Sequence, residues 1–172
     1  YDHAGKELWS RDLGTFVAQH GHGASPMIYD GKVIVTNDQD GESSVVALDL
    51  KTGAVRWKSP RAAGRNPNIA TAYGTPMTHQ RPDGSMELLL TSQSHGVSSL
   101  DLLTGALNWY SPVFDKRMVA SPVVAGDLAI GRLPTDRVGI DVGVDVQRRG
   151  TCTIIKHERR LHQPAVAVLD PE

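Results

Sequence analysis

The sequence has little of what marks several large classes of protein. Its 172 residues include a single cysteine, Cys152, and only 5% aromatic residues. A lone cysteine cannot form a disulfide within the chain, and no cysteine pair is present to bind zinc. The formal net charge is −1, and no apolar run approaches the ~20 residues that span a bilayer. We therefore expect neither a nucleic-acid partner nor a membrane span.

Signatures of catalysis are missing as well. The sequence has no glycine-rich phosphate loop and no nucleophile elbow. Four aspartates recur at equivalent places along the chain, namely Asp2, Asp49, Asp101 and Asp170. Acids that recur with a repeat are expected to form turns, so we predict no catalytic residue among them.

What the chain does have is a phrase that occurs three times and ends in tryptophan. Residues 47–57 read ALDLKTGAVRW, residues 99–109 read SLDLLTGALNW, and residues 1–9 read YDHAGKELW. Each glycine precedes its tryptophan by four positions, and the tryptophans are 48 and 52 residues apart. Repeats of this length are typical of β-propeller blades and other stacked units.

A second landmark keeps the same period. A Ser/Thr-Pro-apolar triplet begins at residues 25, 75 and 121, with spacings of 50 and 46. Between landmarks each unit contains four short runs rich in β-branched and aliphatic residues, which predict strands. In the clearest unit we expect strands at 25–29, 32–36, 43–48 and 54–58. Asp30-Gly31 would form the first hairpin and Lys51-Thr52-Gly53 the last.

The phrase at residues 47–57 resembles the tryptophan-docking motif of the pyrroloquinoline-quinone (PQQ) type β-propellers, A-x-D-x-x-T-G-x-x-x-W. The resemblance covers residues 1 to about 130 and returns at 165–172. It implies an all-β partial propeller of four-stranded antiparallel blades. It also implies that the tryptophans pack between blades while the glycines hold the turns. These structural docking residues are Trp9, Trp57, Trp109, Gly53 and Gly105.

The repeat also predicts how the chain is divided. We expect one propeller arc over residues 1–172, of about three to four blades that do not close a ring. Residues 1–10 would be the last strand of a preceding blade, and 25–58 and 75–110 would be blades. Residues 117–172 would be an incomplete blade with an insertion at 132–163. A solvated hairpin is the favoured interpretation of its basic stretch, with binding of an anionic partner as the alternative.

Strand order predicts a polar face. In an up-and-down blade, the loop that enters the blade and the loop between its second and third strands lie at the same end. Histidine and aspartate are ligand types that suit a divalent metal, although Asn, Asp and Gly also favour ordinary loop hydrogen bonding. Loop bonding is the favoured interpretation, and a metal stays open. The candidates on this face are His20, His22, Asn37, Asp38, Asp40, Arg65, Tyr73 and Arg117.

The resemblance implies two functions. The favoured one is a non-catalytic PQQ-like module that binds or scaffolds in the bacterial cell envelope, periplasmic or secreted, with no cofactor. The family includes the outer-membrane assembly propeller lipoprotein and envelope propellers of unassigned function. Partners would be a protein or glycan, besides the remaining blades of the same propeller. The alternative is a fragment of a PQQ- and calcium-dependent quinoprotein alcohol dehydrogenase, although the sequence lacks the adjacent-cysteine pair of many such enzymes.

Overall fold

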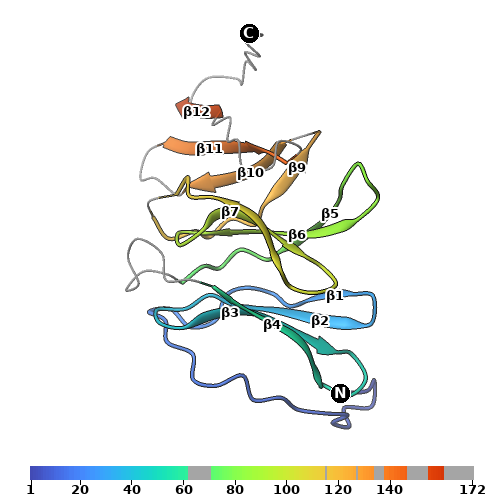
Figure 1. The fold of residues 1–172 in the computed structure, drawn as a ribbon. Coiled ribbons are helices and arrows are strands. Elements are labelled where there is room, and N and C mark those ends of the chain that lie inside the picture. Colours follow the sequence, from blue (N-terminus) through green and yellow to red (C-terminus); the bar gives the residue numbers. More distant parts are fainter. Residues whose placement is uncertain (62–70, 115, 127, 134–137, 147–154, 161–172) are drawn as a thin grey trace.

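The chain folds into a stack of antiparallel sheets (Figure 1). The computed structural model describes residues 1–61, 71–114, 116–126, 128–133, 138–146 and 155–160. Within these ranges every regular element is a strand. No helix there is long and apolar enough to cross a membrane. The first sheet contains β1 (Met27–Tyr29), β2 (Lys32–Asn37), β3 (Ser43–Asp49) and β4 (Val55–Arg61).

Two further sheets repeat this arrangement. The second contains β5 (Met77–Gln80), β6 (Met86–Ser92), β7 (Gly96–Asp101) and β8 (Leu107–Ser111). The third contains β9 (Val123–Ala125), β10 (Leu128–Leu133), β11 (Val138–Asp145) and β12 (Ile155–Arg160). In all three, each strand pairs antiparallel with the next strand in sequence. The predicted four-stranded antiparallel blades and the open arc are confirmed (Figure 1).

The third sheet lies in the stretch for which the sequence predicts an incomplete blade with an insertion at 132–163, and that division stays a prediction. β11 pairs with β10 from Leu133↔Ile140 to Leu128↔Asp145, and β12 pairs with β11. These strands therefore complete the sheet. The physical reason is packing, because Val144 and Val146 are buried against the second sheet. Residues 134–137, 147–154 and 161–172, which include Cys152 and the phrase at 165–172, lie outside the described ranges.

The turn at residues 2–6 repeats the turn of the first sheet although residues 1–10 pair with no strand in the structure. The Asp2 amide donates to Lys6 O, four residues on, at 2.9 Å. The Asp49 amide donates to Ala54 O, five residues on, at 2.7 Å. The one-residue difference matches the shorter first phrase. That residues 1–10 are the last strand of a preceding blade stays a prediction.

The hydrophobic core lies between neighbouring sheets. One cluster joins the first and second sheets through Ile34, Ala47 and Trp57 on one side and Leu88 and Leu100 on the other. A second cluster joins the second and third sheets; its buried members are Ala72, Leu89, Val97, Trp109, Phe114, Met118, Ala129, Val144 and Val146. Alternate residues of a strand face opposite sides of the sheet. The side chains on one side of the second sheet therefore pack in the first cluster, and those on its other side pack in the second. Burial of both faces explains the apolar run at residues 88–90 of β6.

The turn glycine Gly53 provides the first prediction. Its φ is +67°, and a Cβ there would overlap the Trp9 ring. Gly53→Val should lower the free energy of unfolding by about 1–3 kcal/mol through backbone strain, and by more through the ring overlap. Gly31→Val is the matched control, because Gly31 has φ +68° with no atom within 4 Å of its Cβ position. Equal losses in urea unfolding would contradict the ring contact.

Candidate functional site

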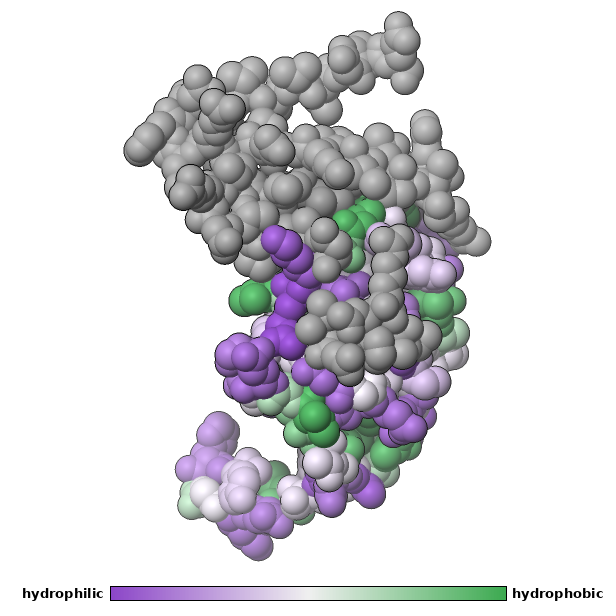
Figure 2. Space-filling model, turned by 90° about the vertical axis from the view of Figure 1, so that its left-hand side faces the viewer, coloured by the Kyte–Doolittle hydropathy of each residue, from purple (hydrophilic) through white to green (hydrophobic). Residues whose placement is uncertain are grey.

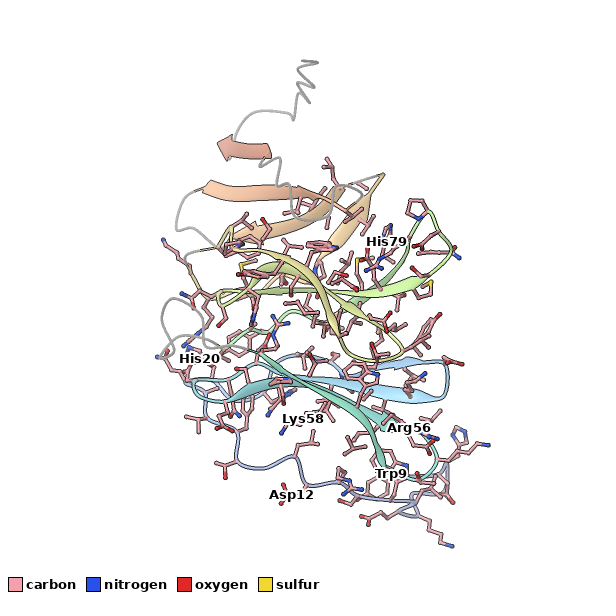
Figure 3. The ribbon with its side chains drawn as sticks, in the orientation of Figure 1. Trp9, Asp12, His20, Arg56, Lys58 and His79 are labelled. Carbon is pink, nitrogen blue, oxygen red and sulfur yellow. The ribbon has the colours of Figure 1, made fainter. Side chains whose placement is uncertain are left out.

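Several polar loops meet at one end of the first two sheets. The Asp40 amide, in the β2–β3 loop, donates to Val17 O at 2.8 Å. The Tyr73 amide donates to Met118 O at 3.0 Å. Figure 2 views the molecule from this side, where hydrophilic side chains gather. Segments before β1, after β2, before β5 and before β9 therefore form a common polar end, which carries His20 in Figure 3.

Asp40 connects these loops. Its Oδ1 accepts hydrogen bonds from Thr71, from the amide at 3.1 Å and from the hydroxyl at 2.7 Å. Its Oδ2 lies 3.4 Å from an Arg117 terminal nitrogen, whose neighbouring nitrogen donates to Gln19 Oε1 at 3.1 Å. Both oxygens of Asp40 are thus engaged by protein groups. The carboxylate is suited to holding the loops together rather than to binding a ligand alone.

The two histidines of this end have different neighbours. His22 Nε2 lies 3.1 Å from Thr36 O, and its ring is 4.9 Å from that of Phe16. The His20 ring is 6.5 Å from that of Tyr73. In the part of the chain that the structure describes, no three His, Cys, Asp or Glu side chains form a group that could hold a metal.

Asp38 is placed in the interior. Its Oδ1 lies 2.7 Å from Arg61 Nε, and the two side chains are 5% and 3% exposed. Arg61 also donates to Ser92 Oγ at 2.8 Å and to Ser98 Oγ at 3.3 Å in the second sheet. Burial raises the pKa of Asp38, while the Arg61 charge opposes that rise. The pair therefore links two blades.

The remaining candidates divide between surface and interior. Asn37 ends β2 and is buried, whereas Tyr73 is half-buried with its ring against Gly23. Arg65 lies outside the described residues. The structure thus brings Asp40, Arg117 and the segment carrying His20 together at the polar end. It places Asp38 inside, away from that surface.

A cleft of about 810 Å³ adjoins the polar end. It lies between residues 13–17 and the first sheet, where Leu13 and Val17 face Asn37, Asp40 and Lys58. Gln39 spans part of it, since its side chain accepts from the Val17 amide at 2.7 Å and donates to Glu42 O at 2.7 Å. The lining is mixed, with hydrogen-bonding groups beside apolar side chains.

Two buried ionisable groups were not singled out from the sequence. Burial, and then the Arg61 charge, lowers the pKa of His95 to about 4, so His95 is neutral at pH 7. Glu87 is fully buried in β6, with Oε1 2.7 Å from His79 Nδ1 and Oε2 3.0 Å from Arg81 Nε. The sequence feature that could have revealed Glu87 is the presence of a glutamate next to the apolar run of β6. His79 lies at the end of the sheets away from His20 (Figure 3).

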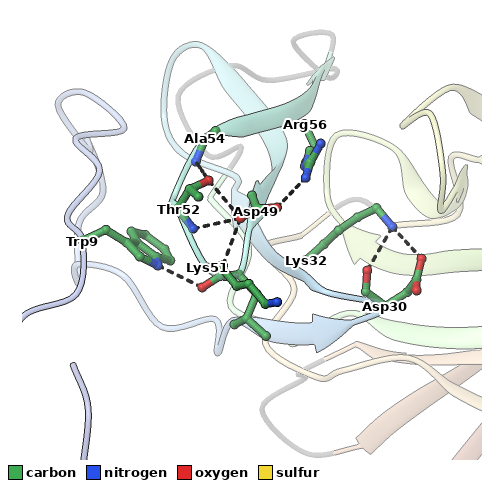
Figure 4. A network of polar contacts seen from close by, with 9 residues as sticks. Trp9, Asp30, Lys32, Asp49, Lys51, Thr52, Ala54 and Arg56 are labelled. Carbon is green, nitrogen blue, oxygen red and sulfur yellow. Dashed lines mark hydrogen bonds and ion pairs between the residues drawn. The ribbon is translucent and has the colours of Figure 1, made fainter.

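Two of the recurring aspartates, Asp49 and Asp101, are held within their turns. Asp49 Oδ1 accepts from the Lys51 amide at 3.0 Å and from the Thr52 amide and hydroxyl at 2.8 and 2.9 Å (Figure 4). Its Oδ2 pairs with Arg56. Asp101 Oδ1 accepts the same three bonds from Leu103 and Thr104. The bonds explain why aspartate recurs at this position.

These bonds predict a pH dependence. The hydrogen bond from Arg56, and then those from Thr52, lower the pKa of Asp49 below its ordinary 3.8. A depressed pKa contributes stability above the unfolded-state pKa, and this is lost as the pH falls through the folded-state value. Asp49→Asn should therefore unfold at a lower temperature than wild type at pH 7, with a smaller difference at pH 3. A difference that stays constant between these pH values would contradict the assignment.

A family model for the PQQ repeat, described as outer membrane protein assembly factor BamB, matches residues 1–138. The chain belongs to the PQQ-like propeller family. Among solved structures, this PQQ-repeat chain is similar to BamB from Moraxella catarrhalis, with 21% identity and a TM-score of 0.57 over 90% of this chain and 43% of that one. It is also similar to a europium-containing methanol dehydrogenase, with 16% identity and a TM-score of 0.64 over 88% and 27%.

At these identities the likeness to solved structures shows the fold alone. The chain spans less than half the length of both solved structures. A search of curated proteins finds no match. The family thus accounts for the repeat, while the role of this PQQ-repeat chain has to be argued from its own residues.

The second repeat landmark has a role that the sequence did not reveal. The Ser25 amide donates to Thr75 Oγ1 at 3.2 Å, and the Thr75 amide donates to Ser121 Oγ at 2.9 Å. The Ser/Thr-Pro triplets of this PQQ-repeat chain therefore form a hydrogen-bonded series from one blade to the next. The spacing of the triplets predicted the repeat, but the contact between blades emerges only from the fold.

Proposed function

We propose that this chain is a non-catalytic PQQ-like repeat module with a binding or scaffolding role in the bacterial cell envelope, periplasmic or secreted, with a protein partner. One observation carries the proposal: among the described residues, the side chains best suited to chemistry are engaged in contacts that hold the fold. Asp38 pairs with Arg61, Asp40 with Thr71 and Arg117. The description of the matched family as an assembly factor supports a protein partner.

The proposal includes a docking role for the tryptophans. Trp9 Nε1 donates to Leu50 O at 2.9 Å in the next blade (Figure 4). A Cβ on Gly105 would lie 2.5 Å from Trp57 Cε3, so that ring covers the turn of the following blade. Large buried rings contribute several kcal/mol to packing. Trp109 would act in the same way on a later turn, and the repeated tryptophan is then architecture rather than a ligand site.

The partner surface would be the polar end and its cleft. Here the chain presents the segment with His20, the mostly buried side chain of Arg117 and the cleft bordered by Leu13 and Lys58. A glycan is the alternative partner, since the same lining could bond sugar hydroxyls. Binding to the purified partner that fails in a Lys58→Glu variant, but persists in an Arg11→Glu variant, would support this location, because Lys58 is exposed and borders the cleft.

A fragment of a quinoprotein dehydrogenase is the second candidate, because the methanol dehydrogenase shares the fold. Such a protein would hold PQQ and calcium. Among the described residues no three His, Cys, Asp or Glu side chains form a cluster that could hold a metal, so they add no support for this candidate. The sequence also has one cysteine and hence no adjacent-cysteine pair. No reaction step is therefore assigned to the chain.

The two candidates differ in a direct assay. The chain is incubated with PQQ and Ca²⁺, desalted, and examined for quinone absorbance and for dye-linked oxidation of a primary alcohol. The proposed module retains no quinone and reduces no dye. Retained quinone together with dye reduction would refute the non-catalytic role. Calorimetry with Ca²⁺ and Zn²⁺ alone tests the metal alternative, where saturable heat lost in His20→Ala would reveal a site.

A further inference from the structure

The outer strands of the three sheets differ in their protection against pairing with another strand. β4, β8 and β12 each end their sheet in the order of strands. β4 reads VRWKSPR and β12 reads IKHERR, whereas β8 reads LNWYS. Charged residues and proline on an edge strand oppose pairing with a further strand. Of these three outer edges, β8 alone has neither.

The strands at the opposite edges of the three sheets are protected because they are short. β1, β5 and β9 contain three, four and three residues. Short strands offer few backbone groups to a partner strand. β8 contains five residues. Outside its ladder with β7, the only backbone bond to β8 among the described residues is from the Val113 amide to Ser111 O.

Side chains beside this edge add an apolar surface. Leu107 and Tyr110 are 51% and 52% exposed, and Leu103 in the preceding turn is 68% exposed. Leu107 pairs with Leu100 and Tyr110 with Ser98, two positions apart in β7, so both lie on the same side of the sheet. The bulge between them, at Asn108, is shared with the first sheet and does not distinguish the two edges.

We infer that β8 is a self-association edge, on which β8 of a second copy of this chain adds antiparallel as a fifth strand. Antiparallel pairing of two β8 strands sets no charged side chain opposite another in any register, because β8 contains no charged residue. The same pairing of β4 about Lys58 would set Lys58 against Lys58. Like charges directly opposite are destabilising.

The charge of the whole chain agrees with a second copy as the occupant. A net charge of −1 on 172 residues produces little repulsion between copies. A pair of five-residue strands buries less than the ~1,200 Å² of stable complexes, so the dimer is weak. Two blades would then be joined across a twofold axis in a continuous eight-stranded sheet. This association does not depend on the proposed envelope role.

Sedimentation velocity over a wide concentration range tests the inference. Wild type should shift from monomer towards dimer as concentration rises. Leu107→Lys should weaken association by roughly tenfold or more, the factor that corresponds to ~1.4 kcal/mol. Val55→Lys is the matched control, because Val55 occupies the same position in β4 and is 49% exposed. That variant should associate like wild type, and thermal melts of both variants establish that they fold.

Hydrogen exchange locates the contact. Raising the wild-type concentration should slow amide exchange in residues 107–111 and leave residues 55–61 unchanged. A wild type that stays monomeric at every concentration would overturn the inference, and so would equal loss of association in the two lysine variants. Concentration-dependent protection confined to the first sheet would overturn it as well, because another surface would then be the contact.

Discussion

Trp57→Ala is expected to lower the free energy of unfolding by about 3–5 kcal/mol, the usual cost of removing a large buried aromatic side chain. Trp57 is 8% exposed, belongs to the core between the first two sheets, and covers Gly105. Its loss would leave a cavity at the contact between blades. Urea unfolding followed by far-ultraviolet circular dichroism measures the change.

Tyr1→Ala is the control for this variant, since Tyr1 is 79% exposed and should cost little. A Trp57→Ala chain that melts like wild type but loses binding of a partner would contradict the architectural role. The tryptophan would then belong to a recognition site. Because Trp57 occupies the position that recurs with the repeat, we expect the loss of stability and not a selective loss of binding.

Arg61→Met is expected to cost about 3–5 kcal/mol at pH 7, because it leaves the Asp38 carboxylate buried and unpaired. It also removes the donors to Ser92 and Ser98 of the second sheet. The arginine and aspartate come from the first blade, so the variant weakens both that blade and its contact with the next. Urea unfolding at pH 7 measures the loss.

The pH dependence of this variant has a definite sign. Burial raises the pKa of Asp38 in the fold, and removing Arg61 takes away the charge that opposes the rise. The folded state then binds a proton more readily than the unfolded state, so the loss of stability shrinks as the pH falls towards 4 and below. Asp38→Leu combined with Arg61→Met should be more stable than Arg61→Met alone at pH 7. A loss that is independent of pH and persists in full in the double variant would contradict the role of the pair.

The sequence predicted the repeated architecture because the strands and turns of each repeat are determined by residues close together in the sequence. Alternating apolar residues and hairpin turns such as Asp30-Gly31 act over a few positions, so the strands of the first sheet were found within about three residues at each end. The turn aspartate Asp49 was assigned to a turn for the same reason, since its bonding partners are the next few residues. The third sheet was harder, because its long β11–β12 connection breaks the period.

The candidate site was only partly predictable. Loop order indicated which segments meet, and Asp40 and Arg117 do lie together. It could not indicate which side chain turns inward, since that depends on a partner far away in the sequence. Asp38 is buried because Arg61 lies beside it. The alternation of β4 puts Arg61 on the same side as the buried Trp57 and Ser59, but an arginine is ordinarily expected at the surface. Glu87 is a similar case, since His79 and Arg81 compensate its burial.

The most direct test of the account is the proton chemical shift of the turn glycines. With a tryptophan ring against each turn, one Hα of Gly53 and one of Gly105 should be shifted upfield by ring current. Trp57→Ala should return the Gly105 signal to its ordinary position and leave the Gly53 signal, which depends on Trp9, unchanged. This result would establish that the repeated tryptophans dock one blade on the next. A Gly105 signal at an ordinary shift in wild type, or one unaffected by Trp57→Ala, would contradict the account.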